Sequence, residues 1–539
     1  MGCARPARRT GQVRRIIQAL SLGLFLYLFL YVAWPYAATF SATVISDKEW
    51  VPLESYLWLD PLAGVSTALA ARQWNVALFG VAGVLLASLA VPRGFCGYVC
   101  PLGILIDGFD WLIGRRFARL RAARPIRWAG VRYYLLAAIL SGSACGVLLA
   151  GYFAAIPVLT RGLFFTVGRL ELGLLRHWGQ VAPADAAAYL SVALLAAIFL
   201  LGLLGRRFWC RHVCPSGALV SLFSVLRLTE RRVKSTCTGC GRCAQACPFG
   251  AVGEDFQARP LQCASCRTCQ GACPADAIRF TSRWAARDER RAEEPAPRGK
   301  VVSRRGLLVS AAGGAVAAAG TRLAFPGGRP EQTPPLRPPG SVPEREFLAL
   351  CIRCGECFKV CPGPVLHPAG LESGLEALWT PVVVPSHAGC HQDCTFCTQV
   401  CPTGAIRPLS VEEKRRTRMG LAVIDVKGCL AHRGERDCRL CYDECEAAGY
   451  RAIEMREIRL EVADVPPGVV SEADLEEMGR IRAPFVAADR CVGCGLCEYR
   501  CHAAMVRQRG LLPNSAVVIR PAESPADGIF CDTPDGHRQ

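Results

Sequence analysis

The chain of 539 residues contains 31 cysteines, and most of them stand at spacings that can hold metal. Two quartets follow the pattern C-x2-C-x2-C-x3-C-P, which is the bacterial spacing for [4Fe–4S] clusters. They are Cys237, Cys240, Cys243 and Cys247, and Cys263, Cys266, Cys269 and Cys273. Two-residue gaps let a short loop wrap its thiolates around one cubane, while the fourth cysteine, marked by proline, reaches the other cluster. We therefore predict one cluster on Cys237, Cys240, Cys243 and Cys273, and a second on Cys263, Cys266, Cys269 and Cys247.

Four further quartets lie nearer the C-terminus and predict four more [4Fe–4S] clusters, six in total. They are Cys351, Cys354, Cys357 and Cys361; Cys390, Cys394, Cys397 and Cys401; Cys429, Cys438, Cys441 and Cys445; and Cys491, Cys494, Cys497 and Cys501. Glu446 and His502 replace the trailing proline of the last two. The spacing does not reveal which quartet lends its fourth cysteine to which. Structural zinc usually takes two C-x2-C pairs about a dozen or more residues apart, so the paired quartets favour iron.

Another cysteine motif occurs twice. Residues Phe95–Gly103 and Trp209–Gly217 both read aromatic-C-x-x-V-C-P-x-G, and each follows an apolar run. A parallel duplication would bring the two motifs together at one membrane surface. Their thiols, Cys96, Cys100, Cys210 and Cys214, would then share one metal or redox site. Alternatively, both motifs are structural loops that dock the neighbouring cluster-binding domain.

The composition indicates that membrane helices position these motifs. Hydrophobic residues make up 51% of the chain and charged residues 20%, with a mean hydropathy of +0.24, which excludes a disordered chain. The length excludes a small secreted disulfide scaffold. Four apolar runs, at about 16–38, 74–92, 131–150 and 185–205, are long enough for helices that cross a bilayer. We predict an α-helical membrane domain with four spans over residues 1–230.

The charge distribution predicts the orientation of these spans. Arginines crowd the N-terminus and the loop 93–127, whereas the loop 39–73 contains only Lys48 and Arg72 as basic residues. Because positively charged loops stay in the cytoplasm, both ends of the four-span unit should be cytoplasmic. The net charge of +18 then reflects membrane topology, and no nucleic-acid partner is expected. No histidine lies inside a run and no C-x-x-C-H motif occurs, so no haem is expected.

Three segments follow the membrane domain. Residues 231–282 should form a cytoplasmic two-cluster ferredoxin domain and residues 344–539 a four-cluster ferredoxin domain. The intervening segment 283–343 combines an Arg-rich linker, Arg304 and Arg305 before a weakly apolar run, and a Pro/Gly-rich linker. Twin arginines at this place are typical of a Tat export signal. Since clusters are built in the cytoplasm, export of the folded domain would make the C-terminal domain periplasmic.

Two outcomes remain open for the predicted signal. Residues 306–325 would stay as a fifth, tethering span, or the run Ala317–Ala319 would mark a cleavage site.

The motifs as a whole resemble a known pair of families. Residues 1–280, with two C-x3-C-P motifs and a two-cluster module, resemble NapH, a four-span membrane protein. Residues 300–510 are similar to NapG, a Tat-exported four-cluster ferredoxin, in their three-residue and eight-residue cysteine gaps and in Cys491-Val-Gly-Cys494-Gly-Leu-Cys497. The chain therefore looks like a NapH–NapG fusion, and MauN and MauM are related pairs. The resemblance implies bacterial-ferredoxin-like α+β domains in a bacterial inner-membrane protein with a cytoplasmic N-terminus.

The predicted function is electron transfer. The NapH–NapG resemblance implies quinol dehydrogenation that feeds a periplasmic c-type cytochrome or nitrate reductase, so the quinone pool is the expected electron donor. The alternative is a maturation or electron-supply factor for another periplasmic redox enzyme, such as methylamine dehydrogenase. No catalytic residue can be named, although His212, Asp107 and Asp110 lie close to the C-x3-C-P loops. How electrons pass between the two membrane faces without haem is left open by the sequence.

Overall fold

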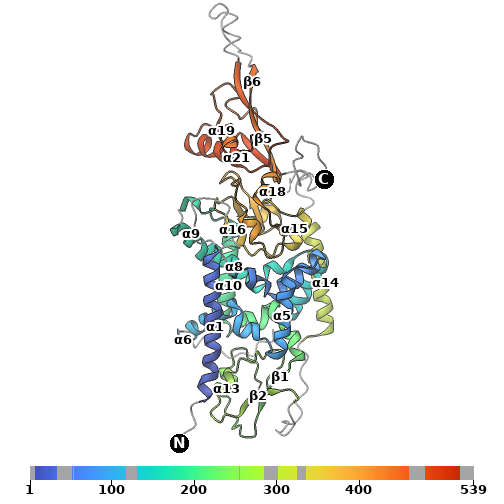
Figure 1. The fold of residues 1–539 in the computed structure, drawn as a ribbon. Coiled ribbons are helices and arrows are strands. Elements are labelled where there is room, and N and C mark those ends of the chain that lie inside the picture. Colours follow the sequence, from blue (N-terminus) through green and yellow to red (C-terminus); the bar gives the residue numbers. More distant parts are fainter. Residues whose placement is uncertain are drawn as a thin grey trace, which may run out of the picture.

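The computed structural model describes residues 6–32, 51–52, 54–116, 130–175, 178–253, 255–284, 302–323, 335–459 and 480–521. Cys3 and Cys531, which have no partner pattern, lie outside these ranges. The molecule is elongated (Figure 1). A small module with strands β1 and β2 lies at one end, helices form the middle, and the cysteine-rich C-terminal domain forms the other end.

The middle part is a helical bundle. Its longer helices are α1 (Pro6–Tyr31), α5 (Ala77–Ala90), α6 (Pro101–Arg116), α7 (Val131–Ala144), α10 (Ala186–Leu200) and α14 (Arg304–Leu323). Its shorter helices are α3 (Glu54–Trp58), α4 (Pro61–Ala71), α8 (Ala155–Leu163), α9 (Arg169–Leu175) and α11 (Pro215–Phe223). The fully buried Asp60 joins three of them, because its carboxylate accepts hydrogen bonds from the Leu62 and Ile156 amides and the Ser216 hydroxyl.

Two helices in the described ranges are long and apolar enough to cross a membrane, Gln12–Tyr31 and Ala186–Leu203. They correspond to the first and fourth predicted spans, although part of the run 16–38 falls outside the described residues. The other two runs form the 14-residue helices α5 and α7. At 1.5 Å per residue each is about 21 Å long, less than the roughly 30 Å of a hydrocarbon core. The run 131–150 is interrupted because Gly146 adopts a left-handed φ of 85° after α7.

Helix α14, which begins at the twin arginines, packs along α7. The Ser303 amide donates to the Tyr134 hydroxyl at 3.0 Å near the first turns of both helices. Gly314 lies so close to α7 that a Cβ atom there would clash with the Ala138 carbonyl oxygen. Ala318, inside the possible cleavage run, is 1% exposed. With 20 residues, α14 is about 30 Å long and connects the two ends of the molecule.

The small module at the first end is a two-stranded α+β unit. Strand β1 (Thr229–Val233) pairs antiparallel with β2 (Ile278–Ser282), with Arg231 opposite Phe280. The short helices α12 (Arg242–Ala246) and α13 (Thr268–Gly271) carry cysteines of the first and second motifs.

The C-terminal domain combines short helices with three two-stranded antiparallel sheets. Its strand pairs are β3 (Leu366–Pro368) with β4 (Pro381–Val383), β5 (Gly420–Ile424) with β8 (Val517–Pro521), and β6 (Ile453–Arg459) with β7 (Arg480–Val486). Its helices are α15 (Glu344–Leu350), α16 (Glu356–Val360), α17 (Phe396–Gln399), α18 (Val411–Arg416), α19 (Leu440–Ala447) and α21 (Leu496–Cys501). The paired strands β6 and β7 point away from the bundle (Figure 1).

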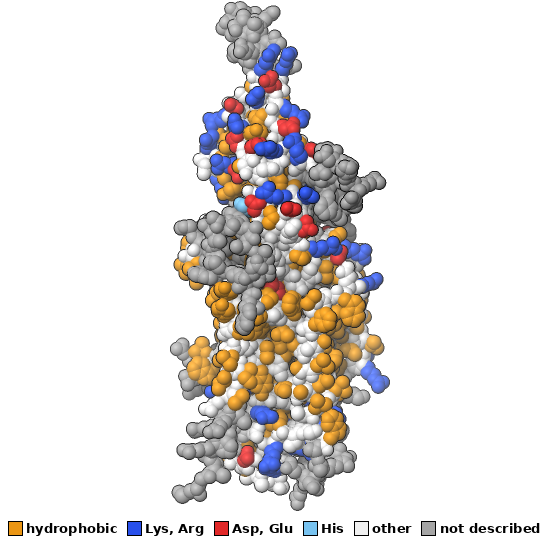
Figure 2. Space-filling model, viewed as in Figure 1, with side chains coloured by type: hydrophobic (Ala, Val, Ile, Leu, Met, Phe, Trp, Pro, Cys, Tyr) orange, Lys and Arg blue, Asp and Glu red, His pale blue; other side chains and the backbone are white. Residues whose placement is uncertain are grey.

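The surface differs between these parts. Figure 2 shows hydrophobic side chains over the bundle and interspersed basic and acidic side chains over the C-terminal domain. Exposed apolar residues of the bundle include Leu20 on α1, Phe79 and Leu86 on α5, and Leu200 on α10. An apolar belt between two more polar ends is typical of a membrane protein.

Candidate functional site

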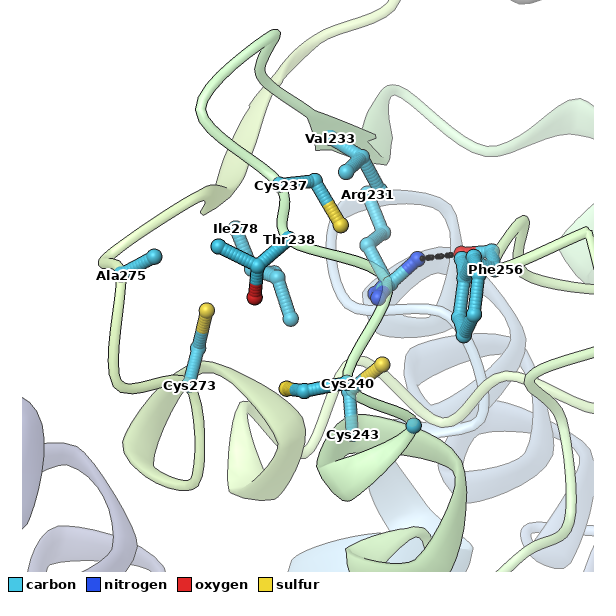
Figure 3. Close-up of a pocket in the computed structure, with 11 residues that line it drawn as sticks. Arg231, Val233, Cys237, Thr238, Cys240, Cys243, Phe256, Cys273, Ala275 and Ile278 are labelled. Carbon is cyan, nitrogen blue, oxygen red and sulfur yellow. Dashed lines mark hydrogen bonds between the residues drawn. The ribbon is translucent and has the colours of Figure 1, made fainter.

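The small module contains two cavities lined by cysteines. The first is lined by Cys237, Cys240, Cys243 and Cys273 (Figure 3). The second is lined by Cys247, Cys263, Cys266 and Cys269. Each cavity takes three thiols from one motif and the fourth from the other, which is the interleaved grouping of a two-cluster ferredoxin.

Arg231 on β1 separates the two cavities and lines both. Its Nη1 donates to the Phe256 carbonyl at 2.6 Å, and its guanidinium also faces the Cys269 thiol. Burial raises the pKa of the Cys269 thiol to about 12, and the positive charge of Arg231 opposes this rise. A buried guanidinium therefore favours the thiolate form that binds iron.

The first cavity of the C-terminal domain is lined by Cys351, Cys354, Cys357 and Cys401. Cys361, the fourth cysteine of the first motif, does not line this cavity. It lies near Cys390 and Cys394 instead, and Cys397 lies near all three. The first two C-terminal motifs are therefore interleaved in the same way as those of the small module.

The last two motifs also exchange their fourth cysteines. Cys441 neighbours Cys429, Cys438 and Cys501. Cys494 and Cys497 neighbour Cys491 together with Cys445. The structure thus supplies the pairing that the spacing left unreadable, and the absent prolines after Cys445 and Cys501 do not prevent it.

These four thiol groups form a series. We name each group after the first cysteine of the motif that supplies three of its thiols: the 351, 390, 491 and 429 groups. Cys357 of the 351 group lies near Cys397 of the 390 group. The Cys390 amide donates to the Cys494 carbonyl at 2.8 Å, which joins the 390 group to the 491 group. Cys497 then lies near Cys441 of the 429 group. The series therefore leads from α16, beside the bundle, to α19 near the far end (Figure 1).

The two C-x3-C-P motifs lie side by side within the bundle. Each begins with a π-helical turn, η1 (Phe95–Val99) or η7 (Trp209–Val213), and each proline starts a helix, α6 or α11. Their four thiols line one cavity. We call this group the quartet; its members are Cys96, Cys100, Cys210 and Cys214. Within the described ranges, no three His, Cys, Asp or Glu side chains are grouped tightly enough to hold a single metal ion.

Two arginines cross-link the motifs reciprocally. Arg93, which precedes the first motif, donates to the Cys210 carbonyl at 3.3 Å. Arg207, which precedes the second, donates to the Cys96 carbonyl at 2.9 Å. Both arginines are at most 1% exposed and have left-handed φ values of 51° and 49°. Sequence reasoning missed this pair, although each arginine stands three residues before the first cysteine of its motif.

The carboxylates of Asp107 and Asp110, beside the motifs, hold Arg207 in place. Asp107 forms an ion pair with Arg207 at 2.5 Å and a second one with Arg14 of α1. Asp110 accepts a hydrogen bond from the Arg207 amide at 2.7 Å. The ring of His212 packs against Phe208 with 4.9 Å between centroids. These contacts give Asp107 and Asp110 structural roles.

The quartet also docks the small module. Phe249 faces both Arg207 and Arg93, with their guanidinium carbons 4.4 and 5.4 Å from its ring centroid. The Tyr98 hydroxyl donates to the Ser265 carbonyl at 3.1 Å. Phe249 lines the cavity of Cys247, Cys263, Cys266 and Cys269. The two interpretations of the motifs are thus compatible, because the same loops dock the module and surround a common cavity.

The C-terminal domain contacts the bundle through the loop of its first motif. Thr160 on α8 donates to the Cys354 carbonyl at 2.9 Å. Arg161 donates to the Arg353 carbonyl at 2.9 Å, and Arg353 donates to the Leu148 carbonyl at 2.8 Å. Both arginines are at most 1% exposed. Nothing in the sequence distinguishes these two arginines from others, so their role emerges only from the fold.

Comparisons with known proteins agree with cluster binding. A model of a 4Fe-4S binding domain matches residues 75–119, and another matches residues 348–369 and 488–504. The LdpA Fe-S cluster-binding domain matches residues 208–258. The methylamine utilization ferredoxin-type protein MauM of Methylophilus methylotrophus is 34% identical over 194 residues, which are 35% of this chain and 71% of that protein. The chain belongs to the MauM family of ferredoxin-type proteins.

Two other ferredoxin-type proteins are also similar to this MauM-family chain. The ferredoxin-type protein NapG of Escherichia coli is 37% identical over 175 residues, which are 31% of this chain and 65% of that protein. MauN of Methylorubrum extorquens is 29% identical over 247 residues, 45% of this chain and 75% of that protein. The expected likeness to NapG is confirmed, whereas the fusion with NapH stays a prediction. No solved structure gives a significant match to this MauM-family chain.

Proposed function

We propose that the protein is a multi-pass inner-membrane electron carrier that passes electrons from quinol to a periplasmic acceptor through six [4Fe–4S] clusters. Each cluster supplies a one-electron carrier when bound. The observation that carries the proposal is the pair of cysteine-lined cavities in the small module together with the series of four cysteine groups in the C-terminal domain. A maturation scaffold has no need of such a series.

The four-span topology is part of the proposal. The apolar belt of the bundle, the two helices Gln12–Tyr31 and Ala186–Leu203, and the placement of the cluster modules at opposite ends all support it. Helices α5 and α7 would cross the bilayer together with the segments that follow them. Arg304 and Arg305 lie at the same end as the small module, which agrees with a cytoplasmic module and a periplasmic C-terminal domain.

The chain's own residues would exclude water and hold charge along this route. The buried guanidinium groups of Arg231 and Arg353 line cysteine cavities of the two ferredoxin modules and would stabilise the negative charge of the thiolates there. The exposed charged residues of the C-terminal domain offer a docking surface for a c-type cytochrome or reductase (Figure 2).

A quinol-reduction experiment tests this function. Full-length protein in membrane vesicles is mixed with a quinol analogue, and cluster reduction is followed by the loss of visible absorbance. Rapid reduction supports the conduit, whereas slow or absent reduction contradicts it. A periplasmic reporter fused after residue 539 tests the topology, because activity only in the cytoplasm would contradict export.

The second candidate is electron supply or maturation for a methylamine-oxidising enzyme. It is favoured by the name of the MauM relatives, which are methylamine utilization proteins. Deletion of the gene separates the two: loss of growth on methylamine with normal nitrate respiration favours the second, and the reverse favours the nitrate branch.

A further inference from the structure

We propose that the quartet Cys96, Cys100, Cys210 and Cys214 binds a seventh [4Fe–4S] cluster, which connects the two ferredoxin modules through the inside of the bundle. This inference rests on the proposed electron-transfer function and adds the missing step between the membrane faces. Its evidence comes from the cavity, from buried charge and from position.

The quartet cavity matches the ferredoxin cavities in ligand type, ligand number and size. Four cysteines line each of the four cavities. The empty space at the quartet, part of it open to solvent, is about 360 Å³, and the corresponding values for the other three cavities are about 350, 390 and 320 Å³. In each ferredoxin cavity the fourth thiol comes from a different motif. The quartet has the same composite character, with two thiols from each half of the internal repeat.

Buried charge gives an independent reason. Arg93 lines the quartet cavity and is 1% exposed, and its Nε has no hydrogen-bond partner among the described residues. Its two described hydrogen bonds go to the neutral carbonyls of Gln262 and Cys210. A buried guanidinium that meets only neutral acceptors is unfavourable, whereas four thiolates around a cluster core would supply negative charge. Arg231 is likewise buried beside the two cavities of the small module, where its guanidinium faces the Cys269 thiol.

Contacts along helix α1 give the position of the quartet relative to the two ferredoxin modules. Its Ser21 hydroxyl donates to the Val99 carbonyl at 2.8 Å, directly before Cys100. Eight residues further, the Phe29 carbonyl accepts a hydrogen bond from Lys359 of α16, the helix that carries Cys357. At 1.5 Å per residue, these two levels are about 12 Å apart along the bundle. On the other side, Arg14 of α1 contacts Thr268 of the small module, about 10 Å below Ser21.

Helix α8 connects the quartet to the C-terminal domain, and the packed ring of Phe249 connects it to the small module. Ala155 at the start of α8 lines the quartet cavity, and Thr160 on the same helix contacts Cys354. These residues are about 7.5 Å apart along the helix axis. In the other direction, Phe249 packs under Arg93 and Arg207 and lines the neighbouring cavity of the small module. The quartet therefore lies between the two modules and in contact with both.

The proposed step balances without further reactants. One electron reaches the quartet site from the centre on one side, and one electron leaves for the centre on the other side. The quartet site thereby returns to its starting oxidation level, and no bond forms or breaks. The electrons are those that the proposed oxidation of quinol supplies, two per molecule, while both protons remain with that reaction.

Iron analysis of the full-length protein, purified anaerobically in detergent, tests the assignment. Seven cubanes give about 28 iron atoms per chain, and six give about 24. The variant Cys210→Ser should lose about four iron atoms and one paramagnetic signal in the dithionite-reduced protein, with the other signals unchanged. The matched control is Cys145→Ser, because Cys145 lies just after α7, is exposed and belongs to no cavity described above. The control should retain the wild-type iron content.

Every outcome of these measurements is informative. A wild-type ratio near 24 that Cys210→Ser does not change overturns the proposal, as does zinc in the quartet or a [2Fe–2S] signature with about 26 iron atoms. If the variant does not fold, the wild-type ratio and spectrum still decide. If quinol reduces no cluster while the ratio stays near 28, the quinol function is wrong and the seventh cluster stands.

Kinetics test the bridging role separately. In the wild-type protein, quinol should reduce signals of both modules. In Cys210→Ser, reduction should stop at one module while dithionite still reduces the other. Equal reduction of both modules in this variant would overturn the bridge.

Discussion

The Oγ1 atom of Thr160 lies 2.9 Å from the carbonyl oxygen of Cys354 and donates a hydrogen bond to it. This contact joins a helix of the bundle to a cluster-binding loop of the C-terminal domain. Since Ala155 of the same helix lines the quartet cavity, α8 fixes the spacing between two cysteine sites that are far apart in the sequence.

The substitution Thr160→Val should loosen this contact. Valine keeps the shape and leaves the Cys354 carbonyl without this partner, so we expect a loss of about 1–3 kcal/mol in the stability of the docked domain. Limited proteolysis of the full chain in detergent measures the effect as faster cleavage of the C-terminal domain. Thr166→Val is the matched control, because the Thr166 hydroxyl bonds to carbonyls of its own helical segment. Equal cleavage of the two variants would contradict a role for the Thr160 contact.

The ion pair between Arg207 and Asp107 can be tested by a double-mutant cycle. Arg207→Met alone removes the most buried partner of the Asp107 carboxylate, which keeps Arg14, so we expect a loss of about 1–3 kcal/mol. The double variant Arg207→Met, Asp107→Leu should lose less than the sum of the single variants. Thermal unfolding of the detergent-solubilised protein provides the measurement. Additive losses would show that the pair contributes nothing specific.

Helix packing at α14 depends on one glycine. Gly314→Ala should destabilise the bundle by about 1–3 kcal/mol, since the added methyl meets the Ala138 backbone. Gly313→Ala is the control, because nothing lies within 4 Å of a Cβ at that position. The control should be neutral or stabilising by up to about 1 kcal/mol, from helix propensity. Thermal unfolding in detergent compares the two, and identical midpoints would mean that α14 does not pack on α7 in this way.

The sharing of fourth cysteines between the last two motifs can be tested by spectroscopy. Cys445→Ser should alter the signal of the cluster held by Cys491, Cys494 and Cys497, not that of its own motif. Cys494→Ser should perturb the same signal, and Cys438→Ser a different one. Paramagnetic resonance of the reduced variants distinguishes them. If Cys445→Ser and Cys438→Ser change the same signal, the pairing derived from the structure is wrong.

The histidine pair of the C-terminal domain predicts acid sensitivity. Burial, with His387 at 4.7 Å between ring centroids and Arg169 nearby, lowers the pKa of His367 to about 4, although the Pro364 carbonyl opposes the shift. Because the unfolded chain takes up a proton near pH 6.5 and the folded one does not, stability is full above that pH. It should fall by up to about 3 kcal/mol as the pH drops from 6.5 towards 4. Denaturant titrations at several pH values measure this slope, and His367→Phe should flatten it. An unchanged slope would exclude His367 as its source.

Much of the cluster chemistry could be predicted from spacing alone. The regular motifs around Cys237 and Cys263 imply interleaved sharing, and the structure groups their thiols in that way. The same principle extends to Cys445 and Cys501, but the eight-residue gap and missing prolines hid it. Sharing depends on how two loops face each other, and this is a property of the fold.

Other features were outside the reach of sequence patterns. The run 131–150 reads as a continuous span, yet the left-handed Gly146 ends α7 early. Buried arginines such as Arg161 and Arg353 look like surface charges in a sequence, because only tertiary packing supplies their carbonyl partners. Hydrophobicity scales assign arginine to water, so a site that recruits it as a buried donor is not found by them.

The buried contacts of Arg353 have a consequence for how the protein works over time. Its side chain donates to the Leu148, Leu378 and Glu376 carbonyls and is covered by the bundle. A C-terminal domain held this way cannot swing on its linker to collect and deliver electrons like a mobile shuttle. In the proposed electron-transfer function, transfer within the molecule should then be insensitive to solvent viscosity, whereas the encounter with a diffusing redox partner should slow as viscosity rises.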